Sequence, residues 1–288
     1  MITTVNFHLI KACNFGCQFC YATFNDITCK GMSKEQHFEI VKAVAQSSYF
    51  KKINFAGGEP TLVPHITELI QYAKSLGLET SIVTNASRIH AEWIKNIAGH
   101  LDILAISVDS ICPETNRLIG RESKGKQIEI NNLLQIAQMC HVYGIALKIN
   151  TVVCEFNKNE ILTDFINQVK PFRWKILQAT RVEGQNDEQY DSIKVSQEEF
   201  EAFCHNNQQY LLPDIKVVIE SNDLIQGSYI MIDPLGRFYD SSTGKYQYSD
   251  KILEVGLEKA LDQIQTDETK FLKREGNYSV HQNKIIKR

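Results

Sequence analysis

The sequence predicts an α/β protein in which strand–helix units build a mainly parallel sheet. Two observations support this prediction: strand-like and helix-like segments alternate at intervals of roughly 25–35 residues, and helix-capping residues stand between them. About six such units fit before residue 220, which is fewer than the eight units of a full barrel. We therefore expect one catalytic core over residues 1–220 and a C-terminal extension over residues 221–288.

In the first half of the chain, capping signals define three helices. Ser33-Lys34-Glu35-Gln36 is a capping box that starts a helix running to about residue 48. Pro64 starts a helix that Gly77 ends, and Gly144 ends an amphipathic helix over roughly residues 127–143. The strands expected in this half lie over residues 1–8, 52–56, 80–84, 101–108 and 145–152.

The second half of the chain continues the alternation. One helix is expected near residues 160–169, and the capping box Ser196-Gln197-Glu198-Glu199 starts another. A last helix is expected near residues 252–264. The strands expected in this half lie over residues 173–179, 215–220 and 228–232.

The composition is that of an ordinary globular protein, with 43% hydrophobic and 23% charged residues in 288 positions. No run of about 18 apolar residues exists, and the first residues lack the charged start and long apolar core of a signal peptide. We therefore expect a cytoplasmic protein without membrane contact. A formal net charge of −3 argues against nucleic acid as a partner, so an anionic ligand needs a local cluster of cations.

Three of the eight cysteines share one short loop, Cys13-Asn14-Phe15-Gly16-Cys17-Gln18-Phe19-Cys20, directly after a strand. Three thiolates on one loop suit an iron–sulfur cluster, because backbone turns let the sulfurs converge on a small inorganic core. A cubane cluster wants four ligands, so three cysteines leave one iron open to a substrate or cofactor. The role of Cys29 is left undecided, and the other cysteines are expected to be small core residues: Cys112, Cys140, Cys154 and Cys204.

Two other interpretations of the cysteine loop stay open on spacing alone. A structural zinc ion would need a fourth ligand, for which His8 or Cys29 could serve. Cys17 and Cys20 could also form a thioredoxin-type redox pair, although such a pair normally opens a helix without a third cysteine upstream.

Strand parity predicts a polar cavity, because residues i and i+2 share one face of a strand. In a parallel sheet covered by helices, both faces should be apolar. Five strands instead carry polar pairs on one face, which favours a barrel interior that holds a ligand over an exposed antiparallel face. The pairs are Asn6 with His8, Lys52 with Asn54, Ser107 with Asp109, Lys148 with Asn150, and Arg173 with Lys175. Their four cations are about what a nucleoside triphosphate requires.

Gly57-Gly58-Glu59-Pro60 follows the strand over residues 52–56. Glycines at this position let the backbone approach a ligand closely, and Glu59 adds a carboxylate; a plain turn is the alternative. Neither a G-x-G-x-x-G dinucleotide fingerprint nor a P-loop motif is present.

The motif C-x-x-x-C-x-x-C after the first strand, followed by Gly-Gly-Glu-Pro after the second, resembles the radical S-adenosylmethionine (SAM) superfamily. Further stretches, in matching order along the chain, are similar to the viperin family, including its prokaryotic members. These stretches are Val5-Asn6-Phe7-His8, Lys52-Ile53-Asn54-Phe55, Leu101 to Ser107, Leu118-Ile119-Gly120-Arg121, Lys148-Ile149-Asn150, Arg173-Trp174-Lys175, Glu220-Ser221-Asn222, Ser228-Tyr229 and Phe271-Leu272-Lys273-Arg274.

The resemblance implies a partial (βα)6 TIM-like barrel of the radical SAM type, with a [4Fe-4S] cluster on Cys13, Cys17 and Cys20. The open iron would hold S-adenosylmethionine, whose reductive cleavage would release a 5′-deoxyadenosyl radical. That radical would take the 4′ hydrogen from a ribonucleoside triphosphate, which would become its 3′-deoxy-3′,4′-didehydro form. CTP is the expected substrate, with UTP or GTP as alternatives, and the product implies an antiviral, anti-phage role as a chain terminator.

The resemblance also assigns site residues. The residues implied for S-adenosylmethionine are Gly57, Gly58, Glu59, Asn85, Ser107 and Arg121. Those implied for the triphosphate and ribose are Asn6, Lys52, Lys148, Asn150, Arg173 and Lys175, with Arg274 on a tail that closes over the phosphates. Tyr229 matches a tyrosine suspected of delivering hydrogen, and we expect Tyr229 and Lys148 to be catalytic. At the tail, Glu275 departs from the glycine that is usual in the family.

The implied partners are the nucleotide and an electron donor of the flavodoxin or ferredoxin type, and we expect a monomer. Two rival functions remain at this point. One is a radical enzyme acting on a peptide or on a purine or pterin precursor, and the other is a zinc-stabilised binding protein without catalysis.

Overall fold

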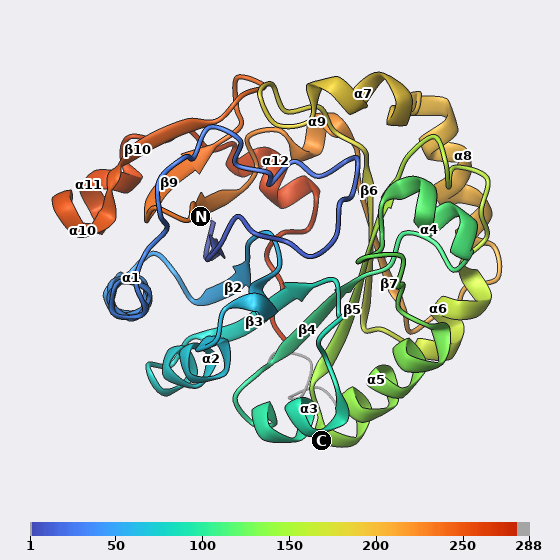
Figure 1. The fold of residues 1–288 in the computed structure, drawn as a ribbon, viewed down its shortest axis with the longest axis horizontal. Helices are drawn as coiled ribbons and strands as arrows, with labels where there is room; N and C mark the ends of the chain where they lie inside the picture. Colours follow the sequence, from blue (N-terminus) through green and yellow to red (C-terminus); the bar gives the residue numbers. More distant parts are fainter. Residues whose placement is uncertain (1, 281–288) are drawn as a thin grey trace.

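A computed structural model describes residues 2–280 of the chain. Its strands form one open ten-stranded sheet within this range, in the order β10-β9-β8-β1-β2-β3-β4-β5-β6-β7. Figure 1 shows the sheet curving, with helices α1, α2, α3, α5 and α6 along its outer side and α12 on its inner side. The predicted α/β class, a partial TIM-like barrel, is confirmed.

Seven consecutive strands pair in parallel, each with the next in the chain. They are β1 (Thr4–His8), β2 (Lys52–Ala56), β3 (Glu79–Thr84), β4 (Ile103–Ser107), β5 (Ala146–Val153), β6 (Arg173–Gln178) and β7 (Lys216–Glu220). The C-terminal strands join the other edge, where β8 (Ile230–Ile232) runs parallel to β1. An antiparallel pair that the sequence did not predict, β9 (Arg237–Asp240) and β10 (Gln247–Lys251), completes the sheet. The proposed division at residue 220 stays a prediction.

The helices start and stop largely where capping chemistry predicted. Both capping boxes are present, with Ser33 and Ser196 as N-caps, and Gly144 ends its helix in the left-handed region with φ 68°. The long helices are α1 (Lys34–Gln46), α2 (Ile66–Ser75), α5 (Ile130–Tyr143) and α8 (Gln197–Gln208). The shorter ones are η1 (Pro60–Leu62), α3 (Ala91–Ile97), α4 (Pro113–Ile119), α6 (Thr163–Val169), α7 (Asp187–Ile193), α9 (Asn222–Ile225), α10 (Ile252–Val255), α11 (Leu257–Leu261) and α12 (Glu268–Lys273).

Two helix predictions were wrong in detail. The helix assigned to Pro64 begins at Ile66 after His65 as N-cap, so the proline lies before the helix rather than at its first position. The helix expected near residues 252–264 is two short helices, because Gly256 breaks the backbone with φ 89° and ψ 154°. Short helices such as α3, α4, α7 and α12 escaped prediction, since fewer than two turns carry little periodicity.

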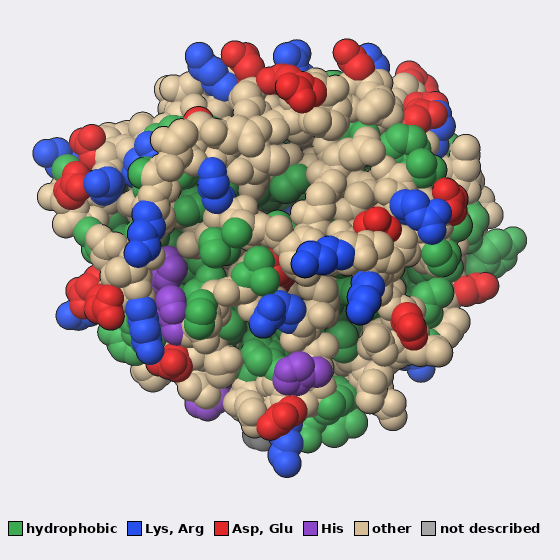
Figure 2. Space-filling model, viewed as in Figure 1, with side chains coloured by type: hydrophobic (Ala, Val, Ile, Leu, Met, Phe, Trp, Pro, Cys, Tyr) green, Lys and Arg blue, Asp and Glu red, His purple; other side chains and the backbone are tan. Residues whose placement is uncertain are grey.

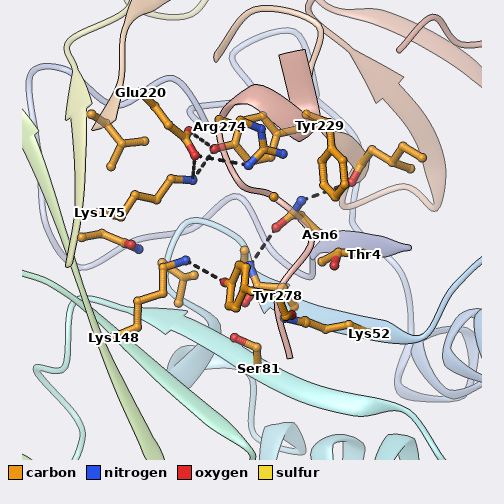
Figure 3. Close-up of a pocket in the computed structure, with 18 of the residues that line it drawn as sticks. Thr4, Asn6, Lys52, Ser81, Lys148, Lys175, Glu220, Tyr229, Arg274 and Tyr278 are labelled. Carbon is orange, nitrogen blue, oxygen red and sulfur yellow. Dashed lines mark hydrogen bonds and ion pairs between the residues drawn. The ribbon is translucent and has the colours of Figure 1, made fainter. Parts of the chain in front are cut away.

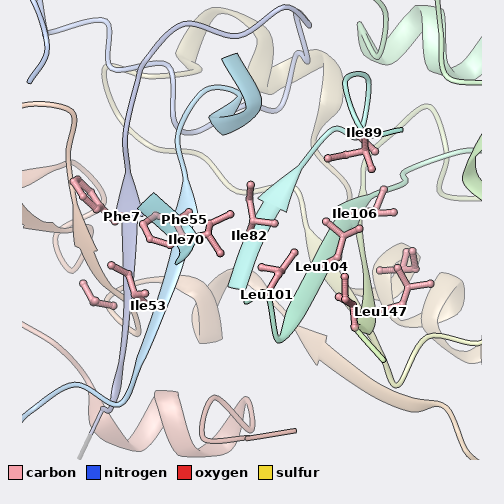
Figure 4. Close-up of a cluster of buried hydrophobic side chains, with 14 of the residues drawn as sticks. Phe7, Ile53, Phe55, Ile70, Ile82, Ile89, Leu101, Leu104, Ile106 and Leu147 are labelled. Atoms are coloured by element: carbon pink, nitrogen blue, oxygen red, sulfur yellow. The ribbon is translucent and has the colours of Figure 1, made fainter. Parts of the chain in front are cut away.

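The apolar core lies between the outer face of the sheet and the helices that cover it. Phe7, Phe55 and Ile82 come from adjacent strands and are fully buried there, as Figure 4 shows. Since side chains alternate along a strand, the polar partners of these residues face the inner side. The core therefore fixes which residues reach the inner cavities.

The outside of the molecule carries charges of both signs. On the face shown in Figure 2, Lys and Arg side chains alternate with Asp and Glu around the rim. No helix within residues 2–280 is long and apolar enough to cross a membrane.

Candidate active site

Two adjoining cavities occupy the inner side of the sheet. The larger has a volume of about 360 Å³ and is bordered by the cysteine loop. The smaller, of about 110 Å³, is lined mainly by polar and charged side chains. His8, Asn150 and Tyr229 border both, so the two cavities share a wall.

The predicted polar face lines the smaller cavity, which we call the cationic cavity. Parallel pairing sets Lys148 beside Arg173 and Asn150 beside Lys175 on neighbouring strands, which rules out the exposed antiparallel face. Four of the five predicted pairs are found here: Asn6 with His8, Lys52 with Asn54, Lys148 with Asn150, and Arg173 with Lys175. Arg274, from the end of α12, joins them. All seven residues predicted for the substrate thus border one cavity.

The fifth predicted pair does not reach this cavity. Ser107 borders the larger cavity instead. Asp109 lies beyond the end of β4, where it forms an ion pair with Arg121 and accepts a 2.7 Å hydrogen bond from the backbone N–H of Val152. Strand parity fails for Asp109 because the chain has already left the strand.

The charges of the cationic cavity are poorly compensated. Burial lowers the pKa of Lys148 and of Lys175 to about 7, and it also lowers the pKa of Lys52. Among the described residues that line this cavity, Glu220 is the one acid, and its Oε1 lies 2.7 Å from Lys175 Nζ. Such a site favours a multiply charged anion, which would restore the protonated state of both lysines.

Part of the cavity is filled by the C-terminal segment, as Figure 3 shows for Tyr278. The Tyr278 hydroxyl lies 3.2 Å from Lys148 Nζ. The guanidinium of Arg173 lies 4.1 Å from the ring centroid and donates a 2.6 Å hydrogen bond to the carbonyl of Glu275. Glu275 takes φ 52°, in the left-handed region where the family's glycine would be unstrained.

The segment that leads into the cysteine loop, residues 10–12, is held against the backbone that follows β2. Gly58 N–H donates to the carbonyl of Ile10 at 2.5 Å, and Glu59 N–H donates to that of Ala12 at 2.9 Å. A Cβ atom on Gly58 would overlap the carbonyls of Lys11 and Ala12. The glycines thus approach residues 10–12, which lead into the cysteine loop. Both glycines also border the larger cavity, and their close approach to a ligand stays a prediction.

Glu59 braces the next turn of this site. It is 1% exposed, and its carboxylate accepts hydrogen bonds from Thr84 Oγ1 at 2.7 Å and from Asn85 N–H at 2.8 Å. Asn85 Nδ2 in turn donates to Asn14 Oδ1 of the cysteine loop at 3.0 Å. All six residues predicted for the cofactor border the larger cavity: Gly57, Gly58, Glu59, Asn85, Ser107 and Arg121.

The three cysteines fit a cluster better than a single metal ion. Cys13, Cys17 and Cys20 border the larger cavity, and burial raises the pKa of the Cys17 thiol to about 12 while Arg121 opposes that rise. Within residues 2–280 no three His, Cys, Asp or Glu side chains converge on one point, as zinc would require. His8, the suggested fourth zinc ligand, packs edge-on against the Phe24 ring instead. Three cysteines that share one loop and border one cavity supply the thiolate donors that an iron–sulfur core uses.

Comparison with known proteins decides the family. Residues 8–165 match the radical SAM superfamily. The chain is 41% identical over 285 residues to an S-adenosylmethionine-dependent nucleotide dehydratase of Flammeovirga pacifica, covering 96% of each chain. The chain belongs to the S-adenosylmethionine-dependent nucleotide dehydratases of the radical SAM superfamily. The resemblance to the viperin family is thereby confirmed.

A second relative supports the family, and a solved structure supports the fold. The dehydratase RSAD2 of Siniperca chuatsi is 36% identical over 289 residues, covering 96% of this chain and 78% of that protein. The solved structure of native anSMEcpe with bound AdoMet has a TM-score of 0.69 at 14% identity, covers 96% of this chain and 84% of its own, and supports the fold alone. Radical SAM enzymes use a [4Fe-4S] cluster and S-adenosylmethionine, which confirms the predicted cofactors and enzyme class.

Several residues that line the site were missed by sequence reasoning. Ser81 on β3 and Glu220 on β7 reach the cationic cavity, and strand parity applied to those two strands would have found both. Tyr21 follows the last cluster cysteine and borders both cavities. Tyr278 had no signal, because it lies in a segment without periodic structure.

Proposed function

We propose that this enzyme dehydrates a ribonucleoside triphosphate to its 3′-deoxy-3′,4′-didehydro form, with CTP as the preferred substrate and UTP or GTP as alternatives. The observation that carries the proposal is the shared wall between the cysteine-lined cavity and the cationic cavity. A cofactor in the first cavity and a triphosphate in the second would meet at Asn150 and Tyr229. The names of the relatives, nucleotide dehydratases, point to the same reaction class.

The larger cavity would hold the cofactors. Cys13, Cys17 and Cys20 would ligate the [4Fe-4S] cluster, and the six predicted cofactor residues would surround S-adenosylmethionine. When bound, these groups would supply the one-electron chemistry that removes a hydrogen atom from the 4′ carbon of the ribose. The protein's own contribution is to hold that carbon close to the cofactor and away from water.

The cationic cavity would hold the substrate. Lys52, Lys148, Arg173, Lys175 and Arg274 would neutralise a triphosphate of about four negative charges. Asn6 and Asn150 would hydrogen-bond the ribose from β1 and β5. Tyr229 would deliver hydrogen at the reacting ribose, and Lys148 would move a proton there. A lysine with a pKa of about 7 can gain or lose a proton near neutral pH.

The biological setting is proposed by family likeness. The enzyme would act in the cytoplasm, take electrons from a flavodoxin- or ferredoxin-type donor, and make a chain terminator for phage polymerases. A tail carrying Arg274 would close over the bound phosphates.

Product analysis tests this function. After anaerobic cluster reconstitution, the enzyme receives S-adenosylmethionine, dithionite and one of the four ribonucleoside triphosphates in separate reactions. A sharp rise of 5′-deoxyadenosine with one nucleotide, which itself loses the mass of one water, supports the proposal and gives the base preference. Slow, equal formation of 5′-deoxyadenosine in every reaction rejects it in favour of another substrate, such as a peptide or a purine or pterin precursor.

Two variants locate the two sites. Lys148→Ala should weaken nucleotide binding far more than S-adenosylmethionine binding, whereas Lys194→Ala, whose lysine pairs with Asp191 on the surface, should change neither. Cys17→Ala should abolish turnover and lower the iron content, while Cys29→Ala, at an exposed cysteine, should keep both. Full activity of Cys17→Ala would reject the cluster assignment.

A further inference from the structure

One carboxylate stands in a cavity that otherwise gathers cations. Glu220 ends β7, and its side chain is only 1% exposed. An acid at this place opposes the binding of a triphosphate through charge repulsion. Its presence therefore calls for a role other than substrate binding.

The contacts of Glu220 converge on Tyr229, as Figure 3 shows. The Tyr229 hydroxyl donates a hydrogen bond to Glu220 Oε2, and Lys175 Nζ donates one to the same hydroxyl oxygen. Glu220 Oε1 lies 2.7 Å from Lys175 Nζ and 3.2 Å from Arg274 Nη1. The carboxylate is thus the common partner of the phenol and of both cations around it.

These contacts fix the phenol in both position and hydrogen-bond direction. Its proton points to Glu220, while its oxygen accepts from Lys175. The Arg274 guanidinium lies 3.7 Å from the Tyr229 ring centroid and restrains the ring from one face. Burial, together with the neighbouring carboxylate of Glu220, holds the pKa of Tyr229 well above its usual value, so the hydroxyl keeps its proton.

We propose that Glu220 is a positioning residue that holds the phenol of Tyr229 at the wall shared by the two cavities, where it lies beside the reacting ribose. This inference rests on the proposed function. Glu220 acts through Tyr229. Without the carboxylate, the phenol loses its fixed direction, so a smaller fraction of the hydrogen abstractions from the substrate leads to the dehydrated product.

A simpler role, neutralising Lys175 and Arg274, makes different predictions. A counterion affects the binding of a triphosphate, and removing it would tighten that binding because one negative charge leaves the cavity. A positioning residue affects the yield of product for each hydrogen abstracted. The measured quantity is therefore the ratio of 5′-deoxyadenosine to dehydrated nucleotide, which does not depend on the fraction of enzyme that carries a cluster.

Two substitutions of Glu220 separate charge from geometry. Glu220→Gln removes the charge at constant size, and Glu220→Asp keeps the charge but shortens the reach to Tyr229. We expect the ratio to rise by roughly fivefold or more in both variants. Glu79→Gln is the matched control. Glu79 also pairs with a cation of this cavity, Lys52 at 3.5 Å, but the Tyr229 hydroxyl donates to Glu220 instead. The ratio of 5′-deoxyadenosine to dehydrated nucleotide in Glu79→Gln should therefore equal that of the wild type.

Dependence on Tyr229 gives the second test. Tyr229→Phe should raise the ratio to a similar extent, and Glu220→Gln combined with Tyr229→Phe should raise it no further, because the two residues act as a unit. The proposal is overturned if Glu220→Asp keeps the wild-type ratio of 5′-deoxyadenosine to dehydrated nucleotide and only Glu220→Gln changes the nucleotide affinity. Glu220 would then be a counterion of Lys175 and Arg274. Multiplying effects in the double variant also overturn it. The proposed function itself is tested separately, on the wild-type enzyme alone: it is rejected if that enzyme dehydrates none of the nucleotides.

Discussion

Lys52 Nζ donates a 2.6 Å hydrogen bond to the backbone carbonyl of Tyr278 and lies 3.6 Å from the centroid of its ring. The chain's own C-terminal segment thus occupies cations that the proposed function assigns to phosphates. Only about 110 Å³ of the cationic cavity stays open beside Tyr278. Sites for ligands of this size usually measure about 300–1,000 Å³, so we expect a nucleotide to displace the Tyr278 ring from the cationic cavity.

Tyr278→Ala should therefore bind the triphosphate more tightly than the wild type. The ring contacts Lys52 and Arg173, and a cation–π contact is worth about 0.5–1 kcal/mol when part of the site is open to water. The two contacts together predict a gain of about 5- to 30-fold in affinity. Titration calorimetry of CTP into cluster-free protein measures it. Tyr278→Phe keeps the ring and serves as the control. Weaker binding by Tyr278→Ala would contradict displacement and would show that the ring contacts the nucleotide.

Nucleotide binding should take up protons at alkaline pH. Burial lowers the pKa of Lys148 and Lys175 to about 7, with Arg173 and Arg274 acting in the same direction on Lys148 and Glu220 opposing them. Phosphates favour the protonated amines, so the complex binds more protons than the free enzyme above pH 7, and affinity falls as pH rises. Calorimetry at about pH 8.5, in two buffers of different ionisation enthalpy, gives the proton number.

The same lysines make stability depend on pH in the opposite sense. Between pH 7 and their ordinary pKa of 10.5, the unfolded chain holds more protons than the folded chain. The free energy of unfolding of the ligand-free protein should therefore gain a contribution that increases with pH across this window. Lys148→Met should reduce both the proton uptake and this slope, whereas Lys194→Met should change neither. Proton uptake that is unaffected by Lys148→Met would contradict the assignment.

Glu59→Gln should destabilise the fold by about 2 kcal/mol, because a buried donor would lose its acceptor. Glu59 Oε1 accepts from the Thr61 N–H, and Oε2 accepts from the Asn85 N–H. An amide has one NH₂ group, so either orientation turns a donor toward a backbone donor. Urea unfolding measures the loss. Glu68→Gln, at an exposed acid paired with Lys34, should cost less than about 0.5 kcal/mol; equal losses would refute the bracing role of Glu59.

The sequence predicted the cavities better than it predicted what fills them. Strand parity depends on regular backbone, so it assigned Lys148 and Asn150 on β5 correctly to a polar cavity, whereas it misplaced Asp109, which lies beyond its strand. Tyr278 lies outside helices and strands, where only tertiary contacts determine position. The short strands β9 and β10 likewise depend on pairing with distant parts of the chain rather than on local pattern.

The Gly-Gly-Glu-Pro turn yields the last prediction, which concerns how the cysteine loop is shaped. A Cβ atom on Gly58 would overlap the backbone carbonyls of Lys11 and Ala12, which directly precede Cys13. We expect the shift of these carbonyls to displace the start of the cysteine loop. Gly58→Ala should therefore lower the iron and sulfide bound after reconstitution to less than about half, with a loss of about 1–3 kcal/mol in unfolding free energy.

Gly16→Ala is the matched control, because Gly16 lies in the same cysteine loop and a Cβ atom there meets nothing within 4 Å. It should bind iron and sulfide like the wild type. Full cluster loading in Gly58→Ala would mean that the glycine is needed for a ligand rather than for the loop. Loss in both variants would mean that the loop tolerates no added side chain, and the specific packing of residue 58 against residues 11 and 12 would not be the cause.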